Sequence, residues 1–146
     1  MMDREKIIKN YIEGYNQFDI EKMVTDFADS IIFENIQNGE TNMSLKGLAA
    51  FKQQAEQAKA YFTKRTQTIK SFVHSENTTE IEVDYSAILG MDFPNGLKKG
   101  QDLNLVGRSI FVFDRNKIIK LTDISWVRKV NIQTTPAANI VPMKRI

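Results

Sequence analysis

Near Lys64 the hydrophobic pattern of this chain changes from a mainly helical to an alternating period, and that change strongly constrains the fold. Before Lys64, apolar residues recur mainly at the spacing of an amphipathic helix. After it they alternate with polar residues, most clearly where Ile81, Val83 and Tyr85 are separated by acids. Such alternation gives a strand one buried face and one solvent-exposed face. The sequence therefore predicts an N-terminal helical part followed by a run of long strands.

Three helices are predicted in the N-terminal part: from about Asp3 to Gln17, from an N-cap at Asp19 to Ala28–Ser30, and from about Leu48 to Phe62. Aspartate caps a helix by accepting a hydrogen bond from a backbone N–H of the first turn. Between the second and third helices, Ile31–Gln37 predicts a strand, and Gly39–Asn42 predicts a turn.

The later part of the chain predicts further strands at about Arg65–Ser75 and Glu80–Leu89. The loop that follows, Met91–Gln101, is long enough to act as a lid over a cavity. The segment FVFDRNKIIKL then indicates a tight hairpin whose two central residues are Arg115 and Asn116, because asparagine tolerates a left-handed backbone.

This hairpin predicts which side chains share a face of the sheet. Ser109 should face Thr122, and Arg108 should face Asp123 as a cross-strand ion pair. One face then carries Leu105, Gly107, Ser109, Phe111, Phe113, Ile118, Thr122, Ile124 and Trp126. The other face is also largely apolar, and one helical layer can cover only one of the two. We therefore expect a homodimer through the second face, centred on Ile110, Val112, Ile119 and Leu121.

The composition excludes several kinds of chemistry. The chain has no cysteine and a single histidine, His74, which removes disulfides, thiolate nucleophiles and multi-histidine metal sites. No metal and no cofactor are expected. No apolar run approaches the roughly 20 residues that span a bilayer. The N-terminus lacks the apolar region of a secretory signal, so the default expectation is a cytoplasmic protein without a membrane partner.

The C-terminal residues differ from the rest of the chain in charge and in proline content. A chain of 146 residues suits one domain, which we place at 1–126. Residues 127–146 hold four basic residues and no acid, so the first 126 residues carry a net charge of −2, which argues against a nucleic-acid surface. The same segment has two of the three prolines and no periodicity. We expect it to form an extended C-terminal arm docked on the body or on a partner subunit.

Several segments, in this order, resemble the nuclear transport factor 2-like superfamily, and within it the SnoaL-like and ketosteroid-isomerase-like branch. They are Tyr11–Glu13, Phe18–Asn35, Lys46-Gly47 and the hairpin segment that ends at Trp126. The resemblance covers roughly Lys6 to Trp126. It implies an α+β, cystatin-like cone, in which three N-terminal helices pack on a curved, mainly antiparallel sheet that encloses a pocket.

The resemblance also implies where an active site would lie. Isomerases of that branch use an aspartate base on the first strand, and a helix-one tyrosine and a protonated carboxylic acid on a late strand to hold the oxyanion. In this chain the base, tyrosine and acid positions correspond to Asn35, Tyr11 and Ser109. An amide cannot act as a general base, so the standard ketosteroid isomerisation is not expected. The adjacent carboxylate, Glu34, should point to the opposite face.

Two functions remain open. The first is an enzyme, such as a cyclase, isomerase, dehydratase or hydrolase, acting on a small apolar carbonyl compound. Its candidate catalytic residues are Tyr11, Asn35 and Ser109, because fixed dipoles in a dry site stabilise developing negative charge. The second is a non-catalytic ligand-binding or dimeric interaction module, whose aromatic side chains simply fill the cavity. His74 has no assigned place. The expected pocket residues are Tyr11, Tyr15, Phe27, Phe33, Asn35, Ser109, Phe111, Thr122, Ile124 and Trp126.

Overall fold

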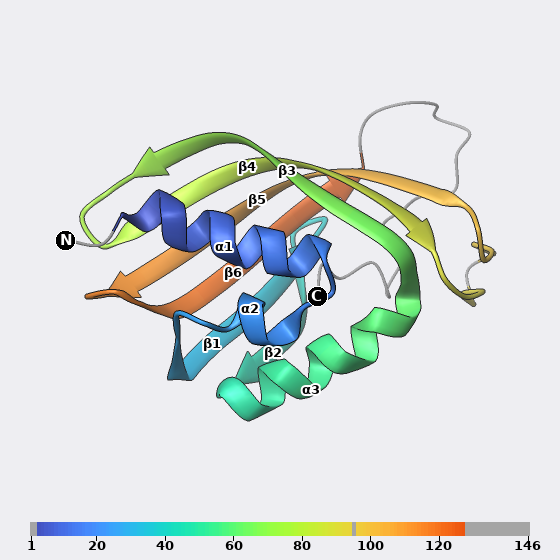
Figure 1. The fold of residues 1–146 in the computed structure, drawn as a ribbon. Helices are drawn as coiled ribbons and strands as arrows, with labels where there is room; N and C mark the ends of the chain where they lie inside the picture. Colours follow the sequence, from blue (N-terminus) through green and yellow to red (C-terminus); the bar gives the residue numbers. More distant parts are fainter. Residues whose placement is uncertain (1–2, 95, 128–146) are drawn as a thin grey trace.

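A curved sheet of six strands wraps around the helices (Figure 1). The computed structural model describes residues 3–94 and 96–127, so the predicted C-terminal arm lies, from residue 128 onward, outside the described residues. The elements are α1 (Arg4–Asn16), α2 (Ile20–Met23), β1 (Phe27–Gln37), β2 (Glu40–Lys46), α3 (Leu48–Ala58), a 3-10 turn (Lys59–Tyr61), β3 (Phe62–His74), β4 (Thr78–Leu89), β5 (Asp102–Asp114) and β6 (Lys117–Val127).

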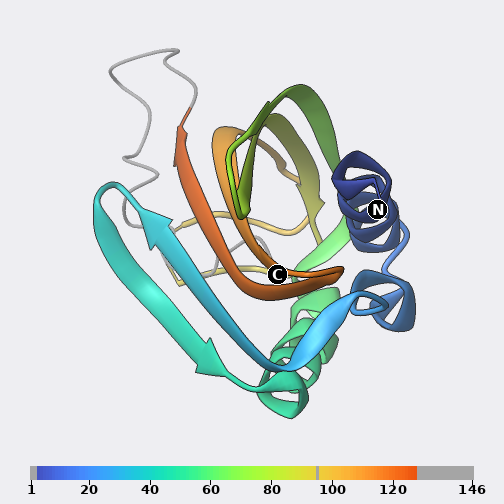
Figure 2. The ribbon, with the colours of Figure 1, turned by 90° about the vertical axis from the view of Figure 1, so that its left-hand side faces the viewer.

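The sheet has the strand order β2-β1-β6-β5-β4-β3. Strand β1 runs parallel to β6, and every other neighbouring pair in this order is antiparallel. Figure 2 shows the strands curving around one side, on which α1 and α2 lie. We call the face toward the helices the inner face and the opposite one the outer face. The described residues thus form the expected mixture of helices and one curved, mainly antiparallel sheet.

The first two helices begin where the caps predict. Asp3 accepts a hydrogen bond from the backbone N–H of Glu5, and Asp19 accepts one from the N–H of Lys22. The predicted length of the second helix is wrong, because α2 ends at Met23 and β1 already begins at Phe27. The reason is tertiary pairing: the N–H of Ile118 on β6 donates to the carbonyl of Asp26, and this pairing overrides the helical spacing of the sequence.

Strand β2 is absent from the sequence prediction, which placed a turn at Gly39–Asn42. The turn lies one residue earlier, at Asn38 and Gly39, which have positive φ values of 53° and 82°. An Asn-Gly pair in this conformation is the favoured two-residue turn of a β-hairpin. Strand β2 is a largely polar edge strand, and such a strand carries little hydrophobic alternation. The third helix also ends earlier than predicted, at Ala58, because Phe62 pairs with Leu89 as the start of β3.

The hairpin between β5 and β6 confirms one prediction and corrects another. Arg115 and Asn116 are its central residues, with Asp114 opposite Lys117, but the left-handed residue is Arg115, at φ 58°. The register changes just beyond the turn, because Phe113 pairs with Ile118 whereas Val112 pairs with Lys120. Ile119 is therefore the extra residue of a β-bulge. From this point every predicted pair is displaced by one residue.

The displacement reverses the predicted faces of β6. Ser109 pairs with Asp123 instead of Thr122, and Arg108 pairs with Ile124 instead of Asp123. Because side chains alternate along a strand, the inner face of β6 beyond the bulge carries Leu121, Asp123 and Ser125, all of them buried. The outer face carries Lys120, Thr122, Ile124 and Trp126. The predicted Arg108–Asp123 ion pair is thus wrong, and Arg108 lies 3.6 Å from Glu80 on the outer face.

The open edge of β3 is covered at one point by a side chain of α1. The side-chain amide of Asn16 donates to the carbonyl of Gln67, at 3.2 Å, and accepts from the N–H of the same residue, at 2.8 Å. Asn16 thereby satisfies the two backbone groups that a further strand would bind at this position.

Gly14 allows α1 and α2 to approach closely. A Cβ atom at this position would lie 2.7 Å from the backbone nitrogen of Met23 and 3.0 Å from the carbonyl oxygen of Asp19. Both neighbours are backbone atoms, one of the last residue of α2 and one of its N-cap, and neither can move without displacing that helix.

We predict that Gly14→Ala lowers the free energy of unfolding by about 1–3 kcal/mol, the range for overpacking, although alanine favours a helix more than glycine does. Urea denaturation measures the change. Lys6→Ala, on the exposed side of the same helix, is the matched control and should stay within about 0.5 kcal/mol of the wild type. Equal stability of both variants would contradict the close approach.

Candidate functional site

Three polar residues lie side by side across the inner face of the sheet. Asn35 on β1 is paired with Asp123 on β6, which is paired with Ser109 on β5. All three are buried, with exposed fractions of 0%, 1% and 1%. The Ser109 hydroxyl donates a hydrogen bond of 2.6 Å to Oδ1 of Asp123. We call these three residues the polar row; it places a carboxyl group inside the cone.

The amide of Asn35 is held from the side of β2. Its Nδ2 donates to Oδ1 of Asn42 at 2.8 Å, and Nδ2 of Asn42 donates to Oε1 of Gln37 at 3.3 Å. The register of β1 and β2 shifts between Asn35 and Ile36, which brings Asn42 into reach as an unpaired extra residue of β2. The bulge therefore helps to fix the orientation of the Asn35 side chain.

The two rows of residues that flank the polar row on the inner face differ in polarity. Phe33, Leu121 and Phe111 form an apolar row next to the polar row, while Gln37, Ser125 and Gly107 form the row on its other side. Adjacent rows on one face lie about 7 Å apart. Gly107 has no side chain, so this second row presents less bulk to the interior. The arrangement gives one hydrophobic wall and one polar wall around a carboxyl group.

Asp123 is the functional candidate that sequence reasoning missed, because a hairpin without a bulge places it on the outer face. One sequence signal points to the bulge. In Ile118-Ile119-Lys120-Leu121, strict alternation from the buried Ile118 would place Lys120 inside and Leu121 outside. One extra residue between them reverses both and keeps the lysine on the outer face.

The aromatic residues of the predicted pocket form a packed cluster. The Tyr11 ring lies 5.6 Å from the ring of Phe27 and 5.8 Å from that of Phe111. Phe51 of α3 contacts both Phe27 and Phe33, at 5.0 Å and 5.5 Å. Tyr11 is 2% exposed and packs from α1 against Phe111 of the apolar row, which lies two residues from Ser109 on the same face. Tyr15 lies further along α1, where its hydroxyl is 3.0 Å from that of Tyr85.

Three of the predicted pocket residues lie on the outer face, as the register shift requires: Thr122, Ile124 and Trp126. Trp126 lies against Arg108, whose guanidinium carbon is 5.9 Å from the ring centre. Leu121, predicted for the dimer face, is instead fully buried in the core, while Ile110 and Val112 are half-buried on the outer face. Ile119, also predicted for the dimer face, is the bulge residue.

His74 does not point into the interior. Its Nδ1 is 2.9 Å from Oγ1 of Thr79, and its Nε2 is 2.8 Å from Oε2 of Glu5. The side chain is 40% exposed. It joins the end of β3 to the first turn of α1, which is a structural role.

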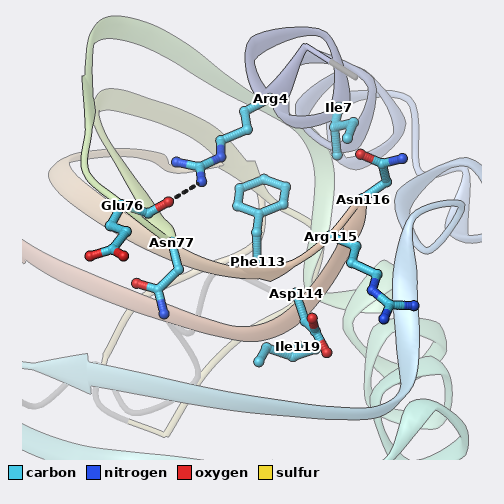
Figure 3. A pocket seen from close by; sticks show the side chains of 9 residues that line it. All are labelled: Arg4, Ile7, Glu76, Asn77, Phe113, Asp114, Arg115, Asn116 and Ile119. Atoms are coloured by element: carbon cyan, nitrogen blue, oxygen red, sulfur yellow. Dashed lines mark hydrogen bonds between the residues drawn. The ribbon is translucent and has the colours of Figure 1, made fainter. Parts of the chain in front are cut away.

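A hollow of about 500 Å³ lies at the end of the sheet where the β3–β4 and β5–β6 turns meet the start of α1 (Figure 3). Its floor includes Phe113, with the guanidinium of Arg4 5.2 Å above the ring centre. Arg4 also donates to the carbonyls of Ser75 and Glu76. Two basic side chains, Arg4 and Arg115, and two acidic ones, Glu76 and Asp114, line the hollow, so it favours neither sign of charge. None of the predicted pocket residues lines it.

Among residues 3–94 and 96–127, no three histidine or acidic side chains are grouped as a metal site. The helices in the same part of the chain include none that is long and apolar enough to cross a membrane.

Comparison with known families shows to which family this chain belongs. The model of the SnoaL-like domain matches residues 8–121, which is most of the chain. The chain belongs to the SnoaL-like domain family. The predicted membership of the nuclear transport factor 2-like superfamily is thereby confirmed. A comparison of this SnoaL-like domain with curated proteins gives no match.

Solved structures show the same fold at low identity. IdmH from Streptomyces antibioticus, described as a candidate polyketide cyclase, is 13% identical over 85% of this chain and 92% of its own, with a TM-score of 0.70. AclR from Streptomyces galilaeus, described as a candidate hydroxylase, is 14% identical over 86% and 79%, with a TM-score of 0.68. A cystatin-fold protein from Novosphingobium aromaticivorans is 16% identical over 85% and 99%, with a TM-score of 0.63. The predicted cystatin-like α+β fold is confirmed.

We predict that Ser109→Ala destabilises the SnoaL-like domain by about 1–3 kcal/mol, because it removes a donor from a buried carboxyl oxygen. Ser125→Ala is a matched control on the adjacent row, since the equally buried Ser125 hydroxyl has no hydrogen-bond partner among the described residues. Chemical denaturation at neutral pH compares the two. Equal losses would show that the Ser109–Asp123 hydrogen bond contributes nothing to stability.

Proposed function

We propose that this SnoaL-like domain binds a small hydrophobic molecule with a carbonyl group at the inner face of the sheet. We further propose that Asp123 moves a proton at the carbon next to that carbonyl, as in an isomerase or cyclase. The observation that carries the proposal is the buried carboxyl group of Asp123, hydrogen-bonded to Ser109 at 2.6 Å and paired with Asn35 across β1 and β6.

The polar row supplies the parts that proton abstraction needs. A carboxylate within hydrogen-bond reach of a substrate C–H group acts as general base, and the Ser109 hydroxyl keeps its carboxyl group in one orientation. Negative charge then develops on the substrate oxygen. The amide of Asn35 and the hydroxyl of Tyr11 are the dipoles in this region that can stabilise such a charge in a buried site. The apolar row beside them excludes water from the reacting atoms.

The proposal differs from standard ketosteroid isomerisation in the position of the carboxyl group. The base position on the first strand is occupied by Asn35, and the carboxyl group comes from β6, the neighbouring strand. The candidate polyketide cyclase among the similar folds agrees with carbonyl chemistry, because polyketides carry carbonyl groups. That agreement rests on the fold and supports the reaction class only.

The second candidate is a non-catalytic binding or interaction module. The tight aromatic packing favours it: Tyr11, Phe33, Phe51 and Phe111 are between 0% and 2% exposed. A cavity filled by the protein's own side chains needs no substrate. Binding and turnover must therefore be measured separately.

We predict that the wild-type protein exchanges the α-proton of a bound aromatic ketone or 1,3-diketone with deuterium from D2O. A thermal-shift screen selects the bound compounds, and NMR follows the exchange. Asp123→Asn should slow it by about 10²–10⁴, the usual contribution of a general base. Asp102→Asn, which alters an exposed carboxylate at the start of β5, should leave the rate unchanged. Bound ketones that never exchange in the wild type would favour the non-catalytic module.

The homodimer remains a proposal, with its face redefined by the register. The outer face carries Ile110, Val112, Ile124 and Trp126, all half-buried within one copy of the chain. The same face carries Arg108, which is the cross-strand partner of Ile124 and lies 3.6 Å from Glu80. A second copy packed face to face would remove these apolar side chains from water.

We predict a mass of twice 16.8 kDa in size-exclusion chromatography with light scattering at micromolar concentration. Ile110→Lys should shift the protein to a monomer, because it would bury a charge in the centre of the interface. Met91→Lys, an exposed apolar residue on the β4–β5 loop, is the control and should leave the mass unchanged. A wild-type monomer at these concentrations would contradict the proposal.

A further inference from the structure

A second buried polar cluster lies on the inner face, at the C-terminal end of α1. Arg65 and Gln67 point inward from β3 and are 1% and 3% exposed. The Tyr15 ring lies against Arg65, Tyr85 is the cross-strand partner of Gln67, and the two tyrosine hydroxyls are 3.0 Å apart. No acidic residue among residues 3–94 and 96–127 forms an ion pair with Arg65. The cluster is therefore rich in hydrogen-bond donors and carries a positive charge.

The guanidinium of Arg65 lies between two aromatic rings. Its central carbon is 3.8 Å from the ring centre of Tyr15 and 4.3 Å from that of Phe18. Its Nε donates to the carbonyl oxygen of Tyr15 at 2.8 Å. The two terminal amino groups are buried and have no hydrogen-bond partner within the described part of the chain.

This arrangement leaves most of the guanidinium unsatisfied. An arginine has five N–H donors, and the Tyr15 carbonyl accepts from one of them. Ring stacking and the negative end of α1 offset part of the cost of burying the charge. Buried charges are otherwise paired and hydrogen-bonded in folded proteins. The four N–H bonds of the terminal amino groups match the two oxygens of a carboxylate or a phosphate, which arginine binds in a bidentate manner.

Phe18 covers this guanidinium from the solvent side. It is half-buried and has a φ of 58°, a left-handed conformation that is unusual for a bulky residue. It lies in the short link between α1 and α2, between Gln17 and Asp19, which are both exposed. This conformation closes α1, because the N–H of Phe18 donates to the carbonyl of Tyr15 and that of Asp19 donates to the carbonyl of Gly14. A rotation of the Phe18 side chain would uncover Arg65 and leave the helices in place.

We propose that Arg65 binds the oxyanion group of a small molecule, a carboxylate or a phosphate, which enters beside Phe18. The site is distinct from the polar row. Ser109 pairs with Ile81, whereas Arg65 pairs with Ala87, six residues further along β4 and so about 20 Å away. Its occupation does not depend on proton transfer by Asp123.

The test uses acetate and inorganic phosphate as probes and acetamide as the neutral counterpart of acetate. Binding to the whole protein is followed by NMR titration of the arginine Nε–H signals in a low-salt buffer. Wild type should bind at least one anion about ten- to a hundredfold more tightly than acetamide, as expected for charge-assisted hydrogen bonds. A preference for acetate identifies a carboxylate ligand, and a preference for phosphate identifies a phosphorylated one.

Two arginine variants distinguish anion binding at the buried Arg65 from anion binding at the protein surface. Arg65→Met should abolish the preference for the anion, whereas Arg108→Met, which removes an exposed guanidinium from the outer face, should retain it. If Arg65→Met does not fold, Arg65→Lys is the alternative. It keeps the positive charge but cannot form bidentate hydrogen bonds to the anion, and it should weaken anion binding about tenfold. Asp123→Asn should bind the anion as the wild type does.

Two results would overturn the inference. The first is equal binding of acetate, phosphate and acetamide by the wild type. The second is an anion preference that survives Arg65→Met but is lost in Arg108→Met, which would show an adventitious surface ion only. Phe18→Ala supplies a further readout, because it should accelerate anion association without reversing the preference.

Discussion

The bulge at Ile119 determines which side chains of β6 lie in the interior of this protein, because side chains alternate between the two faces of a strand. A strand allows two faces only, so one added residue exchanges everything beyond it between the core and the outer surface. Without it, Thr122 and Trp126 would fill the cone and Asp123 would meet Arg108 in solvent. With it, the carboxyl group lies inside against Ser109, and the tryptophan lies outside against Arg108. The bulge at Ile119, close to the hairpin turn, therefore determines on which face of β6 Asp123 lies, four residues further along the strand.

The interior holds two ionisable groups of opposite sign and keeps them apart. Asp123 accepts from a serine at one end, and Arg65 is stacked between two rings at the other; the β4 residues paired with Ser109 and with Arg65 lie six residues, or about 20 Å, apart. Pairing them directly would offset much of their desolvation, and stability alone would favour apolar residues at both positions. Groups retained in spite of this cost are the ones to examine for function. Their separation also gives the interior a polarity, with an acceptor at one end and donors at the other.

Much of the fold could be predicted from the sequence, because long periodic segments and helix caps act locally. Asp19 begins α2, Arg115 and Asn116 form the hairpin turn, and the SnoaL-like resemblance implied the correct architecture. The errors share one cause: pairing with neighbouring strands determines element boundaries and strand faces that the local sequence pattern does not specify. Strand β2 is stabilised by pairing with β1 and has little pattern of its own. The start of β1 looks helical until Ile118 binds the carbonyl of Asp26. Asn35 and Ser109 were placed correctly, since their strands keep strict alternation, but Asp123 was not, because a bulge is a property of two strands.

Asn16 has a consequence for how copies of this chain can meet. A sheet with two free edges can extend by strand addition, and stacked edges are the usual start of uncontrolled association. At Gln67 the backbone donor and acceptor of β3 are already bound by a side-chain amide that imitates a neighbouring strand. Growth of the sheet past β3 would first have to displace helix α1, which carries that amide. The helix that covers the inner face thus also opposes strand addition at this position of the β3 edge.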